Sequence, residues 1–155
     1  MSQIPDYMLD MNAVLHDNTQ WLSGSPPDYS KVNELYTKGR TFKFEAGSLE
    51  DLVSNLVKNW EKEASHKISL GEWRTIDRNK FKMNVNGGKW FTGEELQKLG
   101  TYNLLIGDSE HYCSSLVGTA EKSHRIFRDC FKDGFAWECL EVYSGPPRCC
   151  FKWRH

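Results

Sequence analysis

The chain has 155 residues, which is the usual size of one domain and is long enough to bury a hydrophobic core. Lys and Arg total 20 and Asp and Glu total 21, so the formal net charge is -1. This balance argues against a general nucleic-acid binder or anionic-membrane binder, because both need a basic excess. Aromatic residues make up 13% of the chain, and such side chains fill cores or line apolar ligand pockets.

Residues 1–20 are polar and weakly patterned, which is consistent with either a short helix or a loose arm. Residues 1–11 contain no basic segment followed by an apolar run, as a signal peptide would, and no segment of the sequence approaches the roughly 20 apolar residues of a membrane span. The five cysteines are odd in number and lack CxxC spacing, so we expect neither a disulfide framework nor a zinc site. These features predict a reducing, cytoplasmic location.

The first predicted helix follows Pro26 and Pro27, which block a helix before them. Asp28 or Ser30 can cap its start, and Gly39 is placed to end it.

Residues 48–66 give the clearest helical pattern in the sequence. Ser48 and Asp51 resemble a capping box at its start. Charged residues, among them Lys58, Glu61 and Lys62, are expected on the side away from the core. The apolar positions that recur at helical spacing are Leu49, Leu52, Val53, Leu56, Val57, Trp60 and Ala64.

After residue 70 the alternation of apolar and polar residues predicts strands. Asn86-Gly87 is a type I′ turn signal between residues 81–85 and 89–91, and Thr92 can cap a short helix that ends at Gly100. Ser123 is expected to begin a helix that ends before Gly134. Strands over 135–143 and 148–155 would flank a turn at 144–147. Helices followed by a sheet with short helices between its strands predict an α+β fold.

Three stretches of this sequence resemble the plant and fungal pathogen-related protein family of the SnoaL-like (nuclear-transport-factor-two-like) superfamily, over about residues 21–155. They are Pro-Pro-x-Tyr-x-x-Val-Asn-x-Leu with Gly-Arg-Thr at 26–41, Gly-Ser-Leu-Glu through Trp-Glu to Ser-His-Lys at 47–67, and Gly-Phe-Ala-Trp-Glu through Tyr-Ser-Gly-Pro-Pro to Arg-His at 134–155. The resemblance implies a cone-shaped fold, in which a curved antiparallel sheet packs on the N-terminal helices around an apolar pocket. Residues 21–155 would form this single domain, and residues 1–20 would form an N-terminal arm.

Acid–base chemistry in such a pocket needs a His, Tyr or carboxylate tuned by burial. The candidate catalytic residues are His155, Tyr143, His66 and Glu63. Each is also consistent with an ordinary hydrogen-bonded group in or beside the core. Glu63 and His66 lack the further ligands that a metal requires, so no metal is expected. The candidate pocket walls, which serve equally as core, are Trp60, Phe81, Phe127, Trp137, Phe151 and Trp153.

The wider superfamily includes cofactor-free cyclases, isomerases and dehydratases, and other members only bind a ligand or a partner, so the resemblance does not choose between catalysis and binding. No cofactor is expected in either case. Our first hypothesis is a cyclase or isomerase of secondary metabolism, including a pericyclic one, that acts on a hydrophobic polyketide- or terpenoid-like substrate. The alternative is a non-catalytic pathogen- or stress-related protein that binds a small apolar ligand. Neither hypothesis involves nucleic acid or a membrane. The family pattern continues beyond the last predicted strand. We therefore expect that strand to be covered by a second chain in a homodimer, by a longer form of the protein, or by residues 1–20.

Overall fold

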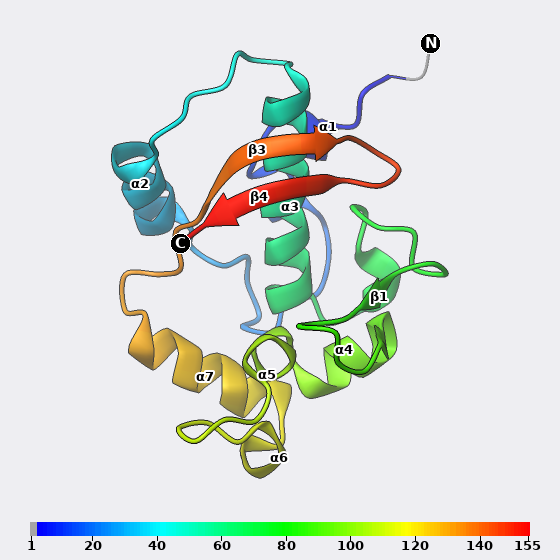
Figure 1. The fold of residues 1–155 in the computed structure, drawn as a ribbon, viewed down its shortest axis with the longest axis vertical. Helices are drawn as coiled ribbons and strands as arrows, with labels where there is room; N and C mark the ends of the chain where they lie inside the picture. The colour runs from blue at the N-terminus through cyan, green and yellow to red at the C-terminus, as the bar shows by residue number, and fades with distance from the viewer. Residues whose placement is uncertain (1–2) are drawn as a thin grey trace.

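The computed structural model describes residues 3–155, and its elements pack around one long helix, α3 (Leu49–His66). Figure 1 shows this helix running through the middle of the structure, with a β-hairpin crossing one side of it. Helix α1 (Asp6–Leu9) and the short 3-10 turn η1 (Ala13–His16) pack on α3 from another side. Mixed helices and antiparallel strands confirm the predicted α+β class.

The start of α3 is fixed by the predicted cap. The side chain of Ser48 accepts a hydrogen bond from the backbone N–H of Asp51 at 3.2 Å. The Asp51 carboxylate accepts from the N–H of Gly47 at 2.9 Å, one residue before the position that an ideal capping box uses. The Ser48 side chain thus satisfies a backbone donor that the first helical turn leaves free, and Asp51 holds the residue before the cap.

The prediction that Lys58 and Lys62 lie on a solvated side of α3 is wrong. Their exposed fractions are only 7% and 2%, because the N-terminal segment and the hairpin cover this side as well. Lys62 Nζ donates to the carbonyl of Met11 at 2.8 Å, and the Asn59 amide donates to the carbonyls of Tyr7 and Asp10. Residues 3–20 are therefore a packed arm whose backbone serves polar side chains of α3.

Helix α2 (Ser30–Gly39) begins where the sequence predicts, and the Asp28 carboxylate accepts from the N–H of Ser30 at 2.8 Å. The predicted hairpin is short, with only β1 (Lys82–Met83) and β2 (Phe91–Thr92). Asn86 and Gly87 both have positive φ, as a type I′ turn requires.

Thr92 and Glu95 form a complete capping box at the start of α4 (Gly93–Leu99), which confirms the predicted short helix. Helix α5 (Thr101–Ile106) follows after Gly100. Beneath these elements lies an apolar cluster of Leu70, Trp73 and Leu96.

Helix α6 (Ser114–Val117) comes after α5, and α7 (Ala120–Cys130) follows it. Helix α7 begins earlier than predicted, because Thr119 rather than Ser123 provides the cap, accepting from the N–H of Lys122 at 3.2 Å. Ser123 is instead buried, with its hydroxyl 3.0 Å from the Tyr112 hydroxyl.

The C-terminal hairpin pairs β3 (Glu138–Ser144) with β4 (Cys150–Arg154), as predicted. Within residues 3–155 it is a separate two-stranded sheet, and the larger cone-shaped sheet stays a prediction. In the same range β4 pairs with β3 alone, and residues 3–20 place no strand beside it. No helix in this part of the chain is long and apolar enough to cross a membrane.

Gly134 joins α7 to the hairpin, and we expect Gly134→Ala to destabilise the protein more than Gly118→Ala. Both glycines have positive φ, which costs an alanine about 1–2 kcal/mol. A Cβ at Gly118 would meet open space, whereas one at Gly134 would collide with the side chain of Val32. Urea denaturation of both variants measures the difference, and equal losses of unfolding free energy would contradict this packing.

Candidate functional site

Glu63 is a structural residue whose carboxylate has no room for a ligand. It is completely buried and forms an ion pair with Lys67, 2.8 Å from Oε1 to Nζ. The backbone N–H groups of Arg74 and Thr75 also donate to it, as does the Thr75 hydroxyl at 2.6 Å. With both oxygens engaged in this way, Glu63 fixes the chain that follows α3.

Two other predicted catalytic residues lie on exposed ends of the hairpin. Tyr143 is 61% exposed and donates to the Glu141 carboxylate at 2.6 Å, and this bond raises the pKa of the phenol. His155 is exposed and stacks on Phe135 with 3.8 Å between ring centroids. The hairpin places neither of them in hydrogen-bond contact with His66.

His66, the fourth predicted catalytic residue, belongs to a cluster of polar groups. Its Nε2 atom lies 3.2 Å from the hydroxyl of Tyr29, which lies 2.9 Å from Oε1 of Glu61 and 3.1 Å from Oε2. The ring of His124 meets that of His66 edge-on at 4.9 Å between centroids. We call Tyr29, Glu61, His66 and His124 the polar cluster; it joins the start of α2, the last turns of α3 and the middle of α7.

Burial sets the ionisation of the polar cluster. It raises the pKa of Glu61 and, together with the neighbouring Glu61 charge, raises the pKa of Tyr29 well above its ordinary value. It lowers the pKa of His66 to about 3, and the charges of His124, Arg128 and Lys62 add to this effect. All four cluster members are partly exposed as whole residues, although their polar ends or rings meet one another. At neutral pH, therefore, His66 is a neutral imidazole and Tyr29 is a phenol.

These groups form a path for a proton. Tyr29 donates to Glu61, so the Tyr29 oxygen is free to accept from Nε2–H of His66. Within the described residues Nδ1 of His66 has no hydrogen bond. With the proton on Nε2, the Nδ1 atom carries a lone pair that can accept a proton. A proton that arrives at Nδ1 sends the Nε2 proton to Tyr29 and the Tyr29 proton to Glu61. The raised pKa of Glu61 and the lowered pKa of His66 both favour this final location.

A continuous run of aromatic rings leads away from the polar cluster. Tyr102 contacts His124 at 5.7 Å between centroids and stacks on Phe127 at 3.6 Å. The run continues to Phe135, which lies 5.4 Å from Phe127, and then to Trp153, which is 50% exposed. We call this set the aromatic run; its members are Tyr102, Phe127, Phe131, Phe135, Trp153 and His155.

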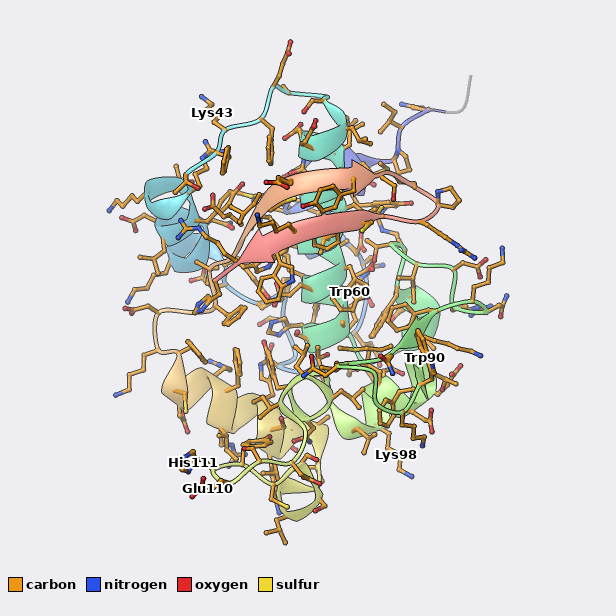
Figure 2. All side chains as sticks on the ribbon, in the orientation of Figure 1. Lys43, Trp60, Trp90, Lys98, Glu110 and His111 are labelled. Atoms are coloured by element: carbon orange, nitrogen blue, oxygen red, sulfur yellow. The ribbon has the colours of Figure 1, made fainter. Side chains whose placement is uncertain are left out.

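The predicted wall residues divide into two groups. Phe127 and Trp153 belong to the aromatic run, and Trp137 lies 6.2 Å from Trp153 between ring centroids. Trp60 and Phe81 instead pack together at 6.1 Å, against the core. Figure 2 shows Trp60 in the middle of the molecule.

Phe151, the remaining predicted wall residue, is partly buried on β4. Trp137 also covers Lys58, whose Nζ lies 4.4 Å from the Trp137 ring and donates to the Trp137 carbonyl at 2.8 Å. Burial lowers the pKa of Lys58 to about 7.

Tyr29 and Glu61 were missed by the sequence reasoning. Tyr29 reads as an apolar residue of a helix face, and Glu61 reads as part of a solvated side. Neither their spacing nor their residue types indicates that α2 and α3 bring them together. Only the contact of the Tyr29 side chain, directly before α2, with the last turns of α3 creates the cluster.

The sequence is similar to that of a plant protein over most of its length. The chain is 36% identical over 143 residues to a protein of Hordeum vulgare named "Pathogen-related protein". The chain is homologous to a pathogen-related protein. The alignment covers 88% of this chain and 61% of that relative, so the chain spans less than two thirds of the relative's length. No protein-family model matches the chain, and no solved structure matches it.

We expect Glu63→Gln to lower the unfolding free energy by about 3 kcal/mol, because Lys67 would keep a buried charge without this partner. Glu110→Gln is the matched control, since Glu110 lies on an exposed outer loop (Figure 2). Chemical denaturation at neutral pH measures both, and a loss no larger than that of the control would show that Glu63 is not the structural anchor described.

Proposed function

We propose that this chain is a cofactor-independent isomerase or cyclase that moves a proton on a hydrophobic, polyketide- or terpenoid-like molecule. The observation that carries the proposal is the hydrogen-bonded set of Tyr29, Glu61 and His66 beside the aromatic run. An acid–base unit next to an apolar surface suits a substrate that is activated by proton transfer and held by its carbon skeleton.

In this mechanism Nδ1 of His66 takes a proton from a carbon next to a carbonyl of the bound molecule. The electron pair of the broken C–H bond moves into the carbonyl as an enolate. The Nε2 proton of His66 passes to Tyr29, and the Tyr29 proton passes to Glu61, so the negative charge of Glu61 is neutralised. Reversal of these steps returns the proton to a different carbon, which completes an isomerisation.

The aromatic run would hold the substrate. Flat rings such as the stacked pair Tyr102 and Phe127 offer apolar surface to polycyclic or polyene skeletons. Trp153 extends this surface as far as the hairpin, where half of the residue is exposed in the single chain. Positioning by these rings would select the carbon that meets His66.

The second candidate function is non-catalytic binding of a small apolar ligand in a pathogen-related protein. The name of the Hordeum vulgare relative favours it, since that name describes an association with pathogens and no reaction. In this case the aromatic run alone would bind the ligand, and the polar cluster would only satisfy its own buried groups.

Exchange of carbon-bound hydrogen in D2O tests the catalytic proposal with polycyclic and polyene ketones as probes. We expect His66→Gln, Tyr29→Phe and Glu61→Gln each to slow deuterium incorporation next to the carbonyl by about 100-fold or more. Exchange in the wild type should also fall as pH decreases through the raised pKa of Glu61, because a protonated Glu61 accepts no further proton. Mass spectrometry of the recovered ketone measures the rate.

The matched controls are His111→Gln and Glu110→Gln, two neighbouring exposed residues on an outer loop (Figure 2). Both should exchange hydrogen at the wild-type rate. Quenching of tryptophan fluorescence by the same ketones reports binding separately. Binding without catalysed exchange would support the second candidate function and contradict the first.

We also propose that the protein is a homodimer in which the free edge of β4 is covered by the second copy. Unpaired strand edges favour association, and Trp153 exposes half its surface on this strand. Sedimentation equilibrium should therefore give twice the mass of the chain, and Trp153→Lys should shift the protein toward the monomer. A wild-type monomer at tens of micromolar would contradict this proposal.

We retain a cytoplasmic location as a proposal. It is supported by the five cysteines, all of which are free.

A further inference from the structure

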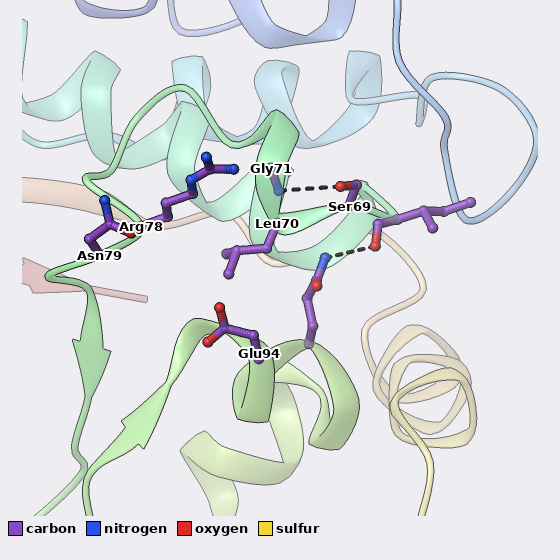
Figure 3. A pocket seen from close by; sticks show the side chains of 8 residues that line it. Ser69, Leu70, Gly71, Arg78, Asn79 and Glu94 are labelled. Carbon is purple, nitrogen blue, oxygen red and sulfur yellow. Dashed lines mark hydrogen bonds between the residues drawn. The ribbon is translucent and has the colours of Figure 1, made fainter.

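A second candidate site lies in a groove between the 3-10 turn η2 (Leu70–Glu72) and helix α4 (Figure 3). The groove has a volume of about 560 Å³, which suits a small molecule. It shares no residue with the polar cluster or the aromatic run. Its walls are formed by Ile68, Ser69, Leu70, Gly71, Arg78, Asn79, Glu94 and Gln97.

Two opposite charges face this groove without being paired to each other. Figure 3 shows the guanidinium of Arg78 and the carboxylate of Glu94 on two sides of Leu70. Within residues 3–155, neither side chain forms a hydrogen bond or an ion pair with another residue. Both are exposed, so their charges are available to a ligand that enters from solvent.

Gly71 allows the guanidinium to lie close to the backbone of the turn. A Cβ at Gly71 would stand 3.3 Å from Nη1 of Arg78, tighter than most side-chain contacts. The turn itself is fixed, because the Ser69 hydroxyl accepts from the N–H of Gly71 at 3.2 Å. Nη1 of Arg78 therefore lies close to the backbone of this turn.

The wall formed by α4 is also held in place by a hydrogen bond. Gln97 donates from Nε2 to the carbonyl of Ile68 at 2.7 Å, which joins α4 to the segment before η2. This bond orients the Gln97 amide and leaves its oxygen as an acceptor. Asn79, next to Arg78, adds a second amide at the wall.

We propose that this groove binds a small zwitterionic molecule, with its carboxylate on Arg78 and its ammonium group on Glu94. A guanidinium binds carboxylate through two parallel hydrogen bonds, and the Gln97 oxygen offers a further acceptor to an ammonium group. A purely anionic ligand would be repelled by the carboxylate of Glu94, and a purely cationic ligand would be repelled by the guanidinium of Arg78. A ligand with both charges satisfies both walls.

Titration of the full-length 15N-labelled protein with linear ω-amino acids, from glycine to 6-aminohexanoate, tests this proposal by NMR. Saturable shifts are expected at the Gly71 amide, the Asn79 side-chain amide and the Arg78 Nε–H. One chain length should bind most tightly, because a ligand reaches both Arg78 and Glu94 only when the distance between its two charges matches their separation across the groove. Butylamine and butyrate, each with one charge, should bind at least 10-fold more weakly.

Arg78→Gln and Glu94→Gln should each raise the dissociation constant of the preferred amino acid at least 10-fold. Arg148→Gln, at an exposed position in the hairpin turn, is the matched control and should leave it unchanged. A dispersed spectrum of each variant verifies folding. The proposal is overturned if no chain length gives saturable shifts, or if Arg78→Gln and Glu94→Gln bind as the wild type does.

Discussion

The structure depends on the burial of polar side chains along helix α3. Four polar residues of α3 are buried in the protein, namely Lys58, Asn59, Lys62 and Glu63. The protein is stable only if each of them has a hydrogen-bond or ion-pair partner, since an unpaired buried amide or charge costs several kcal/mol. Here the partners come from distant parts of the chain. The packed arm supplies carbonyls to Asn59 and Lys62, and the hairpin supplies the Trp137 carbonyl to Lys58. These bonds hold the arm and the hairpin against α3 at particular carbonyls.

The same constraint explains how one helix supports acid–base chemistry. Once α3 is enclosed, Glu61 and His66 at its C-terminal half also lose water, and their pKa values move in opposite directions. Tyr29 links them because its hydroxyl, carried by the residue directly before α2, lies within hydrogen-bond distance of both. Two groups whose environments separate their pKa values in this way are suited to pass a proton between them. The enclosing elements thus set the ionisation of the cluster as well as the fold.

Local sequence signals predicted the elements and several of their ends. The Ser48 cap, the capping box at Thr92 and the turn at Asn86-Gly87 act over three or four residues, so they are readable without the tertiary structure. The solvated side expected for α3 was wrong because a hydrophobic pattern assumes that polar residues face water. The arm that covers this side has no pattern of its own.

The candidate site was predictable only in part. His66 was chosen for its residue type, and it does belong to the polar cluster. Tyr143 and His155 were chosen because a strand with alternating aromatics suggested a common inward face, yet their neighbours on the hairpin leave them exposed. Tyr29 lies 37 residues before His66, and long-range pairs of this kind follow from helix packing rather than from spacing along the chain.

The buried ion pair of Glu63 and Lys67 connects the two proposed sites physically. Lys67 directly follows His66, so the bonds that hold Lys67 to Glu63 and Asp17 also fix the end of α3 at which the polar cluster forms. The chain then turns at once into Ser69, Leu70 and Gly71, which form one wall of the groove. Glu63 further anchors the start of the segment that carries Arg78, through the N–H groups of Arg74 and Thr75. A change at Glu63 should therefore disturb both sites without contacting either ligand, whereas a change at Arg78 or at His66 should disturb only its own.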